Sequence, residues 1–318
     1  MDTDTISIDA ARQILIKAAV QVQEVEDRVL LHALNCVLAH RLVSPINVPS
    51  VSNSAMDGYA VKADISEGKM LQVSQRIPAG SCPLPLKQGT AARIFTGAPL
   101  PDGADAVVIQ EEVSEQERAA VFPKKIVKGQ NVRLIGEDVR LGAQLFSSGH
   151  RVRPQDVGLL ASVGLTKISV RRRLKIAVCS TGNELIDPEI REIKDGEVYN
   201  SNRFAISALL RSWGMEVLDF GILGDDPGLI SEKFLEASQV ADSIVTSGGM
   251  SVGEEDHVKA QISNLGKLSL WKLRIKPGKP FAFGHIGSTP ILGLPGNTVS
   301  AFVTCLLLAK PFLFAQQG

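Results

Sequence analysis

Three patterns of apolar and polar residues follow one another in the first half of the chain. In residues 7–50, apolar side chains recur every three or four positions, which predicts helix with Asp9 as its N-cap. From Pro45 to about Gly142, short runs of Val and Ile alternate with clusters of Gly, Pro, Asp and Ser, a pattern typical of strands and turns. Residues 151–170 then predict a short amphipathic helix followed by a strand.

The second half, residues 171–318, alternates apolar strand patterns with helical ones. Strands are expected at LKIAVCS, GMEVLDFGIL, ADSIVTSGG and TPILGL, and helices at RFAISALLRSW, PGLISEKFLEASQV and NTVSAFVTCLLLAKPF. Apolar strands separated by helices form parallel βαβ units with right-handed crossovers, so this half predicts a doubly wound α/β domain. The basic run Arg171–Arg173 marks the start of this domain, and we expect it to lie on a solvated face.

Composition and charge exclude several classes of protein. At about 150 residues per domain, 318 residues suggest two domains, and 44% hydrophobic with 21% charged residues is typical of a globular protein. The 34 basic residues cancel the 34 acidic ones, so no net field draws the chain to nucleic acid or to an anionic membrane. We therefore expect neither as a partner.

The cysteines and the apolar runs bear on the compartment. Four cysteines are scattered along the chain without a CxxC pair: Cys36, Cys82, Cys179 and Cys305. This spacing argues against a zinc site and a disulfide scaffold. The acidic start MDTDTISIDAARQ is unlike a signal peptide, and the apolar stretch from 299 to 309 is shorter than the ~20 residues of a membrane span. A cytoplasmic protein is the expectation.

Candidate chemistry gathers in the loops that follow the predicted parallel strands, because ligands of open α/β sheets bind beyond the carboxyl ends of the strands. Three polar or glycine-rich segments occupy these places: Ser180–Glu184, Thr246–Gly253 and Pro295–Ser300. Glycine pairs let backbone N–H groups approach an anion, and a helix N-terminus adds partial positive charge. Each loop alone is equally consistent with a tight turn, but three on one edge predict an anion site.

Acidic residues follow the same strands. Glu184, Asp225 and the run Glu254–Asp256 are expected near this edge, whereas Asp226 before Pro227 is explained by a helix cap with proline at its first position. Carboxylates close to a phosphate-binding edge suggest a hard cation such as Mg²⁺ that bridges to substrate phosphates.

Two lysines lie on a loop stiffened by proline and glycine, Lys276-Pro277-Gly278-Lys279-Pro280. Held in this way, Lys276 and Lys279 could present two point charges to an oxyanion, although an ordinary exposed loop remains the alternative. The histidines form no local constellation and no nucleophile elbow is present, so a hydrolase triad is unsupported.

The first half carries polar turns that contain Asp57, Thr96 and Asp138, each compatible with simple turn chemistry when taken alone. Together with the second half, however, they form a series of motifs that resembles the molybdopterin molybdenumtransferase family, the MoeA or gephyrin E-domain enzymes. The motifs are NSAMDGYAV, FTGAPLPDGADAVV, GEDV, STGNEL, YNSN, TSGGMSVGEEDHVK, KPGKPFAFG and LPGN-VSAF. They occur in family order from residue 53 to residue 302.

The resemblance implies an activity and an architecture. Family members insert molybdate into the dithiolene of adenylylated molybdopterin, with Mg²⁺ and release of AMP. They are elongated homodimers, and contact with the molybdopterin adenylyltransferase is implied as well. The implied architecture is an α/β multi-domain fold. An elongated helical dimerisation segment covers 1–50 with 140–170, a β-rich inserted module covers 51–139, and a MogA-like doubly wound α/β domain covers 171–318.

The resemblance also implies roles for individual residues. The catalytic residues it implies are Asp57, Asp138, Asp256, Lys276 and Lys279, with the first two in a cleft completed across the dimer. The substrate-binding residues it implies are Thr96, Glu184, Asn200, Ser247, Gly248, Gly249, Ser251, Pro295 and Asn297. The metal ligands it implies are Glu184, Asp225 and Asp256.

Two departures from the family pattern keep alternatives open. Thr298 stands where the family has a second proline in LPGNPVS, and the sequence stops at Gly318, so that nothing in it would form the family's C-terminal β-barrel. One alternative is a short paralogue that binds molybdopterin or a partner without turnover. A second is a MogA-like adenylyltransferase, against which the SAMDGYA segment argues.

Overall fold

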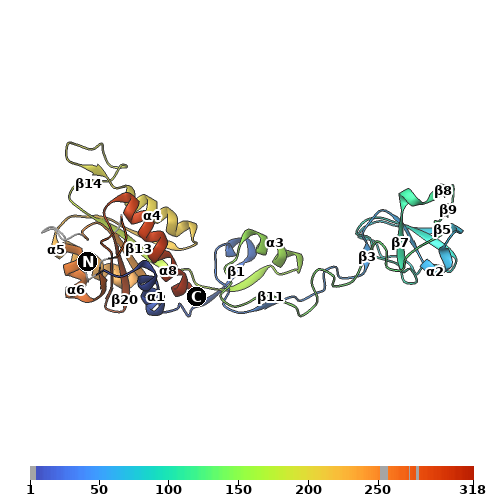
Figure 1. The fold of residues 1–318 in the computed structure, drawn as a ribbon, viewed down its shortest axis with the longest axis horizontal. Coiled ribbons are helices and arrows are strands. Elements are labelled where there is room, and N and C mark those ends of the chain that lie inside the picture. The colour runs from blue at the N-terminus through green and yellow to red at the C-terminus, as the bar shows by residue number, and fades with distance from the viewer. Residues whose placement is uncertain (1–4, 251–256, 272, 277–278) are drawn as a thin grey trace. The chain divides into compact units, whose positions relative to one another are not determined.

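The chain folds into two compact units in its computed structural model, which describes residues 5–250, 257–271, 273–276 and 279–318 (Figure 1). The α/β unit comprises Met1–His40, Gly149–Pro154 and Lys167–Gly318, and the β unit comprises Arg41–Ser148 and Gln155–Thr166. The predicted α/β multi-domain fold is confirmed. The finer division into segments at 50, 139 and 170 stays a prediction.

A six-stranded sheet in the order β16-β13-β17-β20-β19-β18 forms the centre of the α/β unit. Its strands are β13 (Lys175–Thr181), β16 (Glu216–Leu223), β17 (Ser243–Ser247), β18 (Gly266–Trp271), β19 (Ala282–Ile286) and β20 (Thr289–Leu294). The four strands predicted from sequence, β13, β16, β17 and β20, are parallel neighbours. The sequence did not predict β18 and β19, which extend the sheet with antiparallel pairings.

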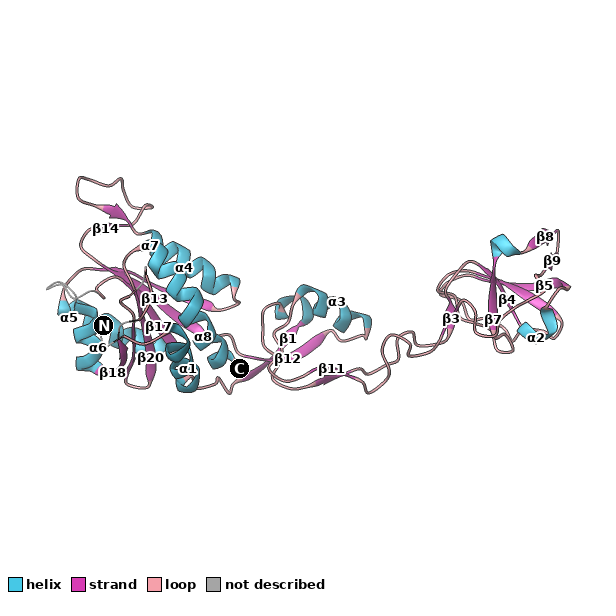
Figure 2. Cartoon of the chain, in the orientation of Figure 1, coloured by secondary structure: helices cyan, strands magenta, loops and turns pink. Residues whose placement is uncertain are grey.

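Helices cover both faces of this sheet (Figure 2). They are α1 (Ile8–Ala18), α4 (Ser201–Ser212), α5 (Pro227–Val240), α6 (His257–Leu265), α7 (Thr298–Thr304), the π-helical segment η3 (Cys305–Ala309) and α8 (Lys310–Gln317). Because side chains alternate along a strand, Ile176 and Val178 of β13 pack with α1, α4, α7 and α8 on one face. Ala177 and Cys179 pack with α5 and α6 on the other.

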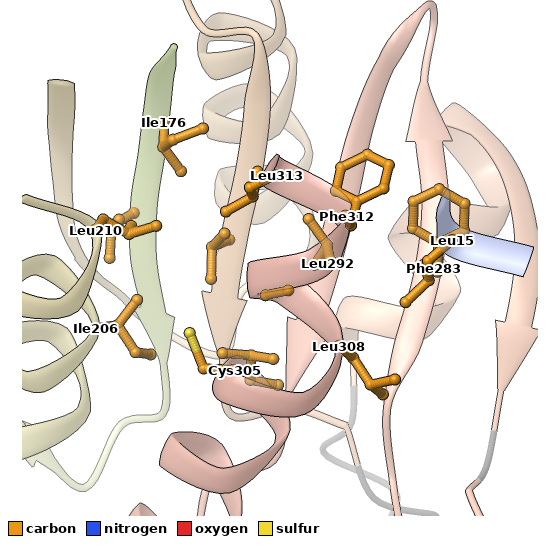
Figure 3. Close-up of a cluster of buried hydrophobic side chains, with 14 of the residues drawn as sticks. Leu15, Ile176, Ile206, Leu210, Phe283, Leu292, Cys305, Leu308, Phe312 and Leu313 are labelled. Carbon is orange, nitrogen blue, oxygen red and sulfur yellow. The ribbon is translucent and has the colours of Figure 1, made fainter. Parts of the chain in front are cut away.

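The segments α7, η3 and α8 form one helix from Thr298 to Gln317, long and apolar enough by composition alone to cross a membrane. The apolar stretch noted in the sequence, residues 299–309, is only its first part. Its buried residues belong to the core of the α/β unit: Phe312 lies 5.3 Å from Phe283 of β19 between ring centroids, and Leu308 points into the same cluster (Figure 3). Packing against the sheet accounts for its apolar character.

The helix predicted over residues 7–50 is wrong beyond Ala18. Residues Val25–Val29 form strand β1, which pairs with β12 (Lys167–Arg171), and only the 3₁₀ turn η1 (Leu30–Ala33) follows. A partner more than a hundred residues away in sequence overrides the local helical spacing. The cap was also misplaced, because Ser7, not Asp9, caps α1 by accepting a hydrogen bond from the N–H of Ala10.

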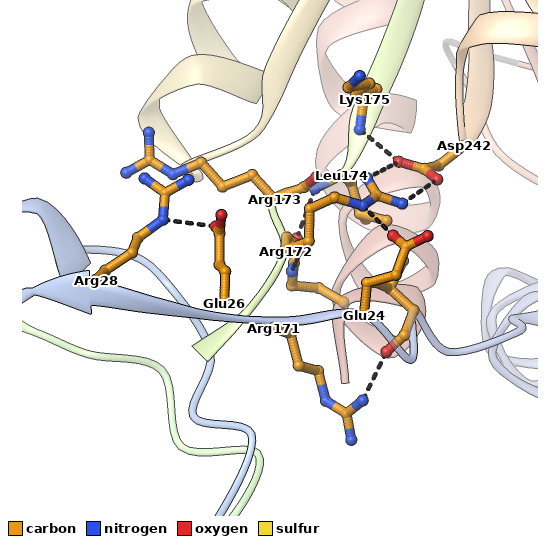
Figure 4. A network of polar contacts seen from close by, with 11 residues as sticks. Glu24, Glu26, Arg28, Arg171, Arg172, Arg173, Leu174, Lys175 and Asp242 are labelled. Atoms are coloured by element: carbon orange, nitrogen blue, oxygen red, sulfur yellow. Dashed lines mark hydrogen bonds and ion pairs between the residues drawn. The ribbon is translucent and has the colours of Figure 1, made fainter. Parts of the chain in front are cut away.

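The basic run at the start of the α/β domain is not a free solvated face. Arg172 binds both oxygens of Asp242, at 2.8 and 2.9 Å, and also contacts Glu24 (Figure 4). Arg171 donates to the carbonyl of Val22 at 2.6 Å. These bonds tie the N-terminal segment to the strands of the sheet, so the expectation of a solvated role is wrong for these two residues.

The β unit holds a second six-stranded sheet, in the order β7-β4-β6-β5-β9-β8. Its strands are β4 (Gly58–Val61), β5 (Met70–Ile77), β6 (Thr90–Ile94), β7 (Ala106–Ile109), β8 (Ser114–Gln116) and β9 (Ala119–Val121). Two short pairs accompany it, β2 (Leu42–Val43) with β11 (Gln144–Phe146) and β3 (Asn53–Ser54) with β10 (Val132–Arg133). The remaining elements are α2 (Ala63–Ser66), η2 (Gln110–Glu112) and α3 (Pro154–Ser162). The predicted β-rich character of this stretch is confirmed.

Candidate functional site

The carboxyl ends of the parallel strands carry two adjoining hollows in the α/β unit. The first, about 450 Å³, is lined by the turns after β13, β17 and β20 and by Asp225. The second, about 280 Å³, lies between β14 (Leu185–Ile186), β15 (Val198–Tyr199) and the N-termini of α4 and α7. Thr181, Glu184 and Gly248 line both, so we treat them as one candidate site, the strand-end pocket.

Backbone of the turn after β17 lies directly against β13. Gly248 and Gly249 both have positive φ, +91° and +59°, and a Cβ on Gly248 would lie 2.3 Å from the carbonyl oxygen of Thr181. A Cβ on Gly249 would lie 2.8 Å from the Thr181 hydroxyl. Glycine is therefore required here for conformation and for space. The absence of side chains leaves backbone groups at the pocket wall.

The acidic groups of the pocket are held by local contacts. Asp225 accepts a hydrogen bond from the backbone N–H of Asn183 at 2.9 Å, and the side-chain oxygen of Asn183 accepts one from the backbone N–H of Asp225 at 3.1 Å. Glu184 folds over Gly182, where a Cβ would lie 2.4 Å from its carboxylate. Asp226 caps α5, accepting from the N–H of Leu229 at 2.7 Å, as predicted.

Two helices begin at the pocket. Asn200 caps α4, accepting from the N–H of Arg203 at 3.2 Å, and Asn297 caps α7, accepting from the N–H of Ser300 at 3.1 Å. Asn202 joins the two starts by donating to the carbonyl of Gly296 at 2.7 Å. Helix N-termini carry partial positive charge, so this part of the pocket attracts anions.

Several buried polar atoms at the pocket lack a partner within the described structure. They are the hydroxyl oxygen of Thr181, the side-chain nitrogen of Asn200 and the side-chain oxygen of Asn202. All three residues are at least nine-tenths buried and line the hollow between α4 and α7. A buried polar group without a hydrogen bond is costly, so these atoms are suited to a polar ligand.

Of the other residues predicted for this half of the chain, some line the pocket and others do not. Ser247 lines the pocket, but its hydroxyl lies 2.9 Å from that of Ser180 and is thereby engaged. Pro295 lines it as well, whereas Lys276 and Lys279 are exposed, and neither is among the described lining residues. Ser251 and Asp256 lie outside the described residues.

The described carboxylates give a partial cation site. Of the three predicted metal ligands, Glu184 and Asp225 share the pocket. Within the described part of the chain, no three His, Cys, Asp or Glu side chains gather closely enough to hold a metal unaided. Mg²⁺ is commonly held by one or two carboxylates together with water and substrate phosphates, so these two residues fit that ion.

The β unit contains the remaining predicted residues. Asp57 accepts two hydrogen bonds at 2.8 Å from Thr96, one from the backbone N–H and one from the hydroxyl. These bonds, the backbone one first, lower the pKa of Asp57 below its ordinary value. Thr96, which the resemblance places against substrate, thus contacts Asp57 in this structure.

Asp138 forms an ion pair with Arg133, a residue that the sequence analysis missed. The pairing of β3 with β10 places Arg133 opposite Asn53, which brings the segments before Asp57 and before Asp138 together within the β unit. The only signal in the sequence was an arginine five positions before an aspartate, which is common.

The fold defines an α/β protein whose strand-end pocket has the helix N-termini and unpartnered polar atoms that suit a polar, anionic ligand. Comparison with known proteins specifies the class further. Residues 6–164 match the family model described as "MoeA N-terminal region (domain I and II)", and residues 177–315 match "Probable molybdopterin binding domain".

Relatives cover most of the chain. The molybdopterin molybdenumtransferase of Haemophilus influenzae is 40% identical over 98% of this chain and 78% of its own length. Molybdopterin molybdenumtransferase 2 of Mycobacterium tuberculosis is 35% identical over 91% and 74%. The crystal structure of a molybdopterin biosynthesis MoeA protein from Pyrococcus horikoshii OT3 is 27% identical, with a TM-score of 0.86 over 99% of this chain and 80% of that one.

This chain belongs to the molybdopterin molybdenumtransferase family. It is therefore a transferase of molybdenum cofactor biosynthesis, as the motifs indicated.

Proposed function

We propose that this chain inserts molybdenum into adenylylated molybdopterin, using molybdate and Mg²⁺ and releasing AMP, at the strand-end pocket. The dithiolene sulfurs bond to molybdenum, and one molybdate oxygen leaves with the two thiol protons as water. One water cleaves the pyrophosphate bond, so that AMP departs and the phosphate remains on the pterin product. The observation that carries the proposal is one pocket that combines a glycine turn, two helix N-termini and two carboxylates.

The charges of the substrates explain why a site would combine a glycine turn, helix N-termini and carboxylates. Molybdate is a dianion and the adenylylated pterin carries a pyrophosphate, so like charges must be gathered at one place. The glycine turn at Gly248 lets a ligand approach the backbone closely, and the N-termini of α4 and α7 supply fixed dipoles that cost no reorganisation. The unsatisfied atoms of Thr181, Asn200 and Asn202 suit a ligand rich in donors and acceptors, such as a pterin or a nucleotide.

Glu184 and Asp225 are the residues that would hold Mg²⁺, with Asp256 as the further ligand implied by the family. When bound, the ion supplies charge neutralisation to the pyrophosphate. Asn183 keeps one oxygen of Asp225 engaged at 2.9 Å, which fixes the orientation of the carboxylate.

The remaining assignments belong to the same proposal. Lys276 and Lys279 hold molybdate or pyrophosphate oxygens, and Ser251 contacts the substrate. Asp57 and Asp138, with Thr96 beside the first, face the reaction from a second copy of the chain in a homodimer. Support for this role comes from the two hydrogen bonds of Thr96, which fix the orientation of the Asp57 carboxylate.

The test uses two neighbouring aspartates. Asp225→Asn should reduce molybdate-dependent AMP release from adenylylated molybdopterin by about a hundredfold or more, the scale of a lost charge contact in a transition state. Asp226→Asn is the matched control, because asparagine caps a helix as well as aspartate does and turnover should persist.

Equal rates of AMP release in the two variants would show that Asp225 has no part in the site. The assignment of Asp225 as a ligand of Mg²⁺ would then be wrong. Consumption of ATP with molybdopterin as the acceptor, in place of AMP release, would make the chain an adenylyltransferase. Tight binding of the pterin without release of AMP would make it a binding protein.

A further inference from the structure

Another hollow of the α/β unit lies at the opposite end of the parallel strands. Arg173 precedes β13 and Gly214 precedes β16, so both sit at the amino ends of parallel strands, away from the strand-end pocket. Arg28, His32 and Arg211 line the same hollow, whose volume is about 410 Å³. We call the group Arg28, His32, Arg173 and Arg211 the basic pocket.

The charge of the basic pocket is poorly balanced. Arg28 donates from Nε to Glu26 at 2.6 Å, and its terminal nitrogens have no recorded bond among the described residues. Among the described residues, the side chain of Arg173 reaches the carbonyl oxygens of His32 and Leu34 alone, at 3.5 and 3.4 Å, which is long for a hydrogen bond. The Nε of Arg173 is buried without a partner.

Arg211 adds a third guanidinium. It lies in the last turn of α4, where a cation offsets the negative end of the helix dipole, and it makes no ion pair with any described residue. That local role explains one arginine at the helix end. It does not explain why Arg28 and Arg173 extend toward one another from β1 and from the residue before β13 (Figure 4).

Two other arginines of the α/β unit have their charge balanced by carboxylates. Arg172 contacts two carboxylates, Asp242 and Glu24, and Arg203 contacts Asp187 and Asp219. In the basic pocket, by contrast, Arg28 pairs with one carboxylate, that of Glu26, and the described residues give Arg173 and Arg211 no ion pair. Like charges held together repel one another, and an anion between them would relieve that repulsion.

We propose that the basic pocket binds a doubly charged tetrahedral oxyanion of the phosphate class, either free or as a phosphomonoester. Guanidinium forks match the spacing of the oxygens of such an anion and bind it through two parallel hydrogen bonds. None of the residues lining the pocket is acidic, so nothing in its wall repels a dianion. The volume exceeds that of inorganic phosphate, which leaves room for an organic substituent.

The test measures binding of three probes, inorganic phosphate, molybdate and glycerol phosphate, by calorimetry at constant ionic strength. Arg211→Gln and Arg28→Gln should each weaken binding by about tenfold, the effect of one charge-assisted hydrogen bond. Arg12→Gln is the control, because Arg12 lies on α1 and pairs with Asp9 outside the pocket. Tighter binding of glycerol phosphate than of phosphate would identify a phosphomonoester as the ligand, and the reverse a free oxyanion.

A direct check is anomalous diffraction from crystals soaked in molybdate, which should show a peak among Arg28, Arg173 and Arg211. Equal affinity of all three variants and the wild type, or peaks confined to the strand-end pocket, would overturn the proposal. The inference stands apart from the proposed function, because Arg211→Gln should leave AMP release unchanged.

Discussion

Asn183 and Asp225 hold each other's backbone: each side chain accepts a hydrogen bond from the other residue's N–H, at 2.9 and 3.1 Å. The pair joins the turn after β13 to the loop before α5, across 42 residues of sequence. Asp225 therefore enters the pocket with its orientation already fixed.

Asn183→Ala should lower the apparent affinity for Mg²⁺ more than it lowers the stability of the fold. The backbone N–H of Asp225 loses its acceptor, so one of the two hydrogen bonds that position Asp225 is lost while the bond from the Asn183 backbone N–H to the carboxylate remains. Losing a contact that supports a metal ligand lowers metal affinity by about ten- to a hundredfold. Measuring AMP release against Mg²⁺ concentration should show a higher half-saturating concentration, with the rate recovering in excess Mg²⁺. An unchanged Mg²⁺ dependence would show that the pair has no part in metal binding.

Gly248→Ala should remove activity and destabilise the α/β unit. The new Cβ meets the carbonyl of Thr181 at 2.3 Å on a backbone with φ of +91°, and such strain costs about 1–3 kcal/mol. Urea unfolding and AMP release are the measurements. Gly196→Ala is the matched control, because Gly196 has a φ of +85° but nothing within 4 Å, so it should cost about 1 kcal/mol with turnover intact. Normal turnover in Gly248→Ala would contradict the role given to this turn.

Thr96→Val should raise the pKa of Asp57 toward its ordinary value. The backbone N–H bond remains while the hydroxyl bond is lost, so part of the depression persists. A carboxyl with a lowered folded pKa stabilises the protein above its ordinary pKa, and that contribution is lost as pH falls through the folded pKa. The variant should therefore lose less stability below the ordinary pKa, with that loss complete at a higher pH, and a carbon-13 titration of Asp57 reports the shift directly. Thr90→Val, which loses a bond to Ser74 instead, should leave the titration unchanged.

Asp242→Asn should lower the free energy of unfolding by about 1–3 kcal/mol, because the charge-assisted bonds to Arg172 are weakened. The side chain of Asp242 is only 20% exposed, and Asp242 also accepts from the N–H of Lys175 at 2.6 Å. Denaturant unfolding followed by circular dichroism measures the loss. Glu236→Gln removes the exposed pair with Lys233 and should cost less than about 0.5 kcal/mol. Similar losses of unfolding free energy in both variants would mean that burial of the pair between Arg172 and Asp242 adds nothing to stability.

Local patterns in the sequence predicted much of the α/β unit. The fully buried strands β17 and β20 lie in stretches centred on Ile, Val and Leu, and the cap at Asp226 follows from residue type and spacing alone. The strand-end pocket followed from one rule about parallel sheets, and Glu184 and Asp225 share it.

Features that depend on distant partners could not be predicted. Strand β1 has two valines about half exposed and becomes a strand only by pairing with β12. Asn183 and Arg133 looked like ordinary loop residues, since their roles depend on Asp225 and Asp138 after folding. Strands β18 and β19 are antiparallel additions to a parallel sheet, which the alternation of strands and helices does not indicate.

The packing of α1 against α8 has a consequence for how the protein is made. Leu15 belongs to the same buried cluster as Phe312 and Leu313, so during synthesis α1 completes its packing only after α8 has left the ribosome. The β unit, encoded between them, can fold while the nascent chain is still growing. Until Phe312 and Leu313 have left the ribosome, the apolar side of α1 lacks part of its packing, and this interval is when chaperones would have a binding site on the newborn polypeptide.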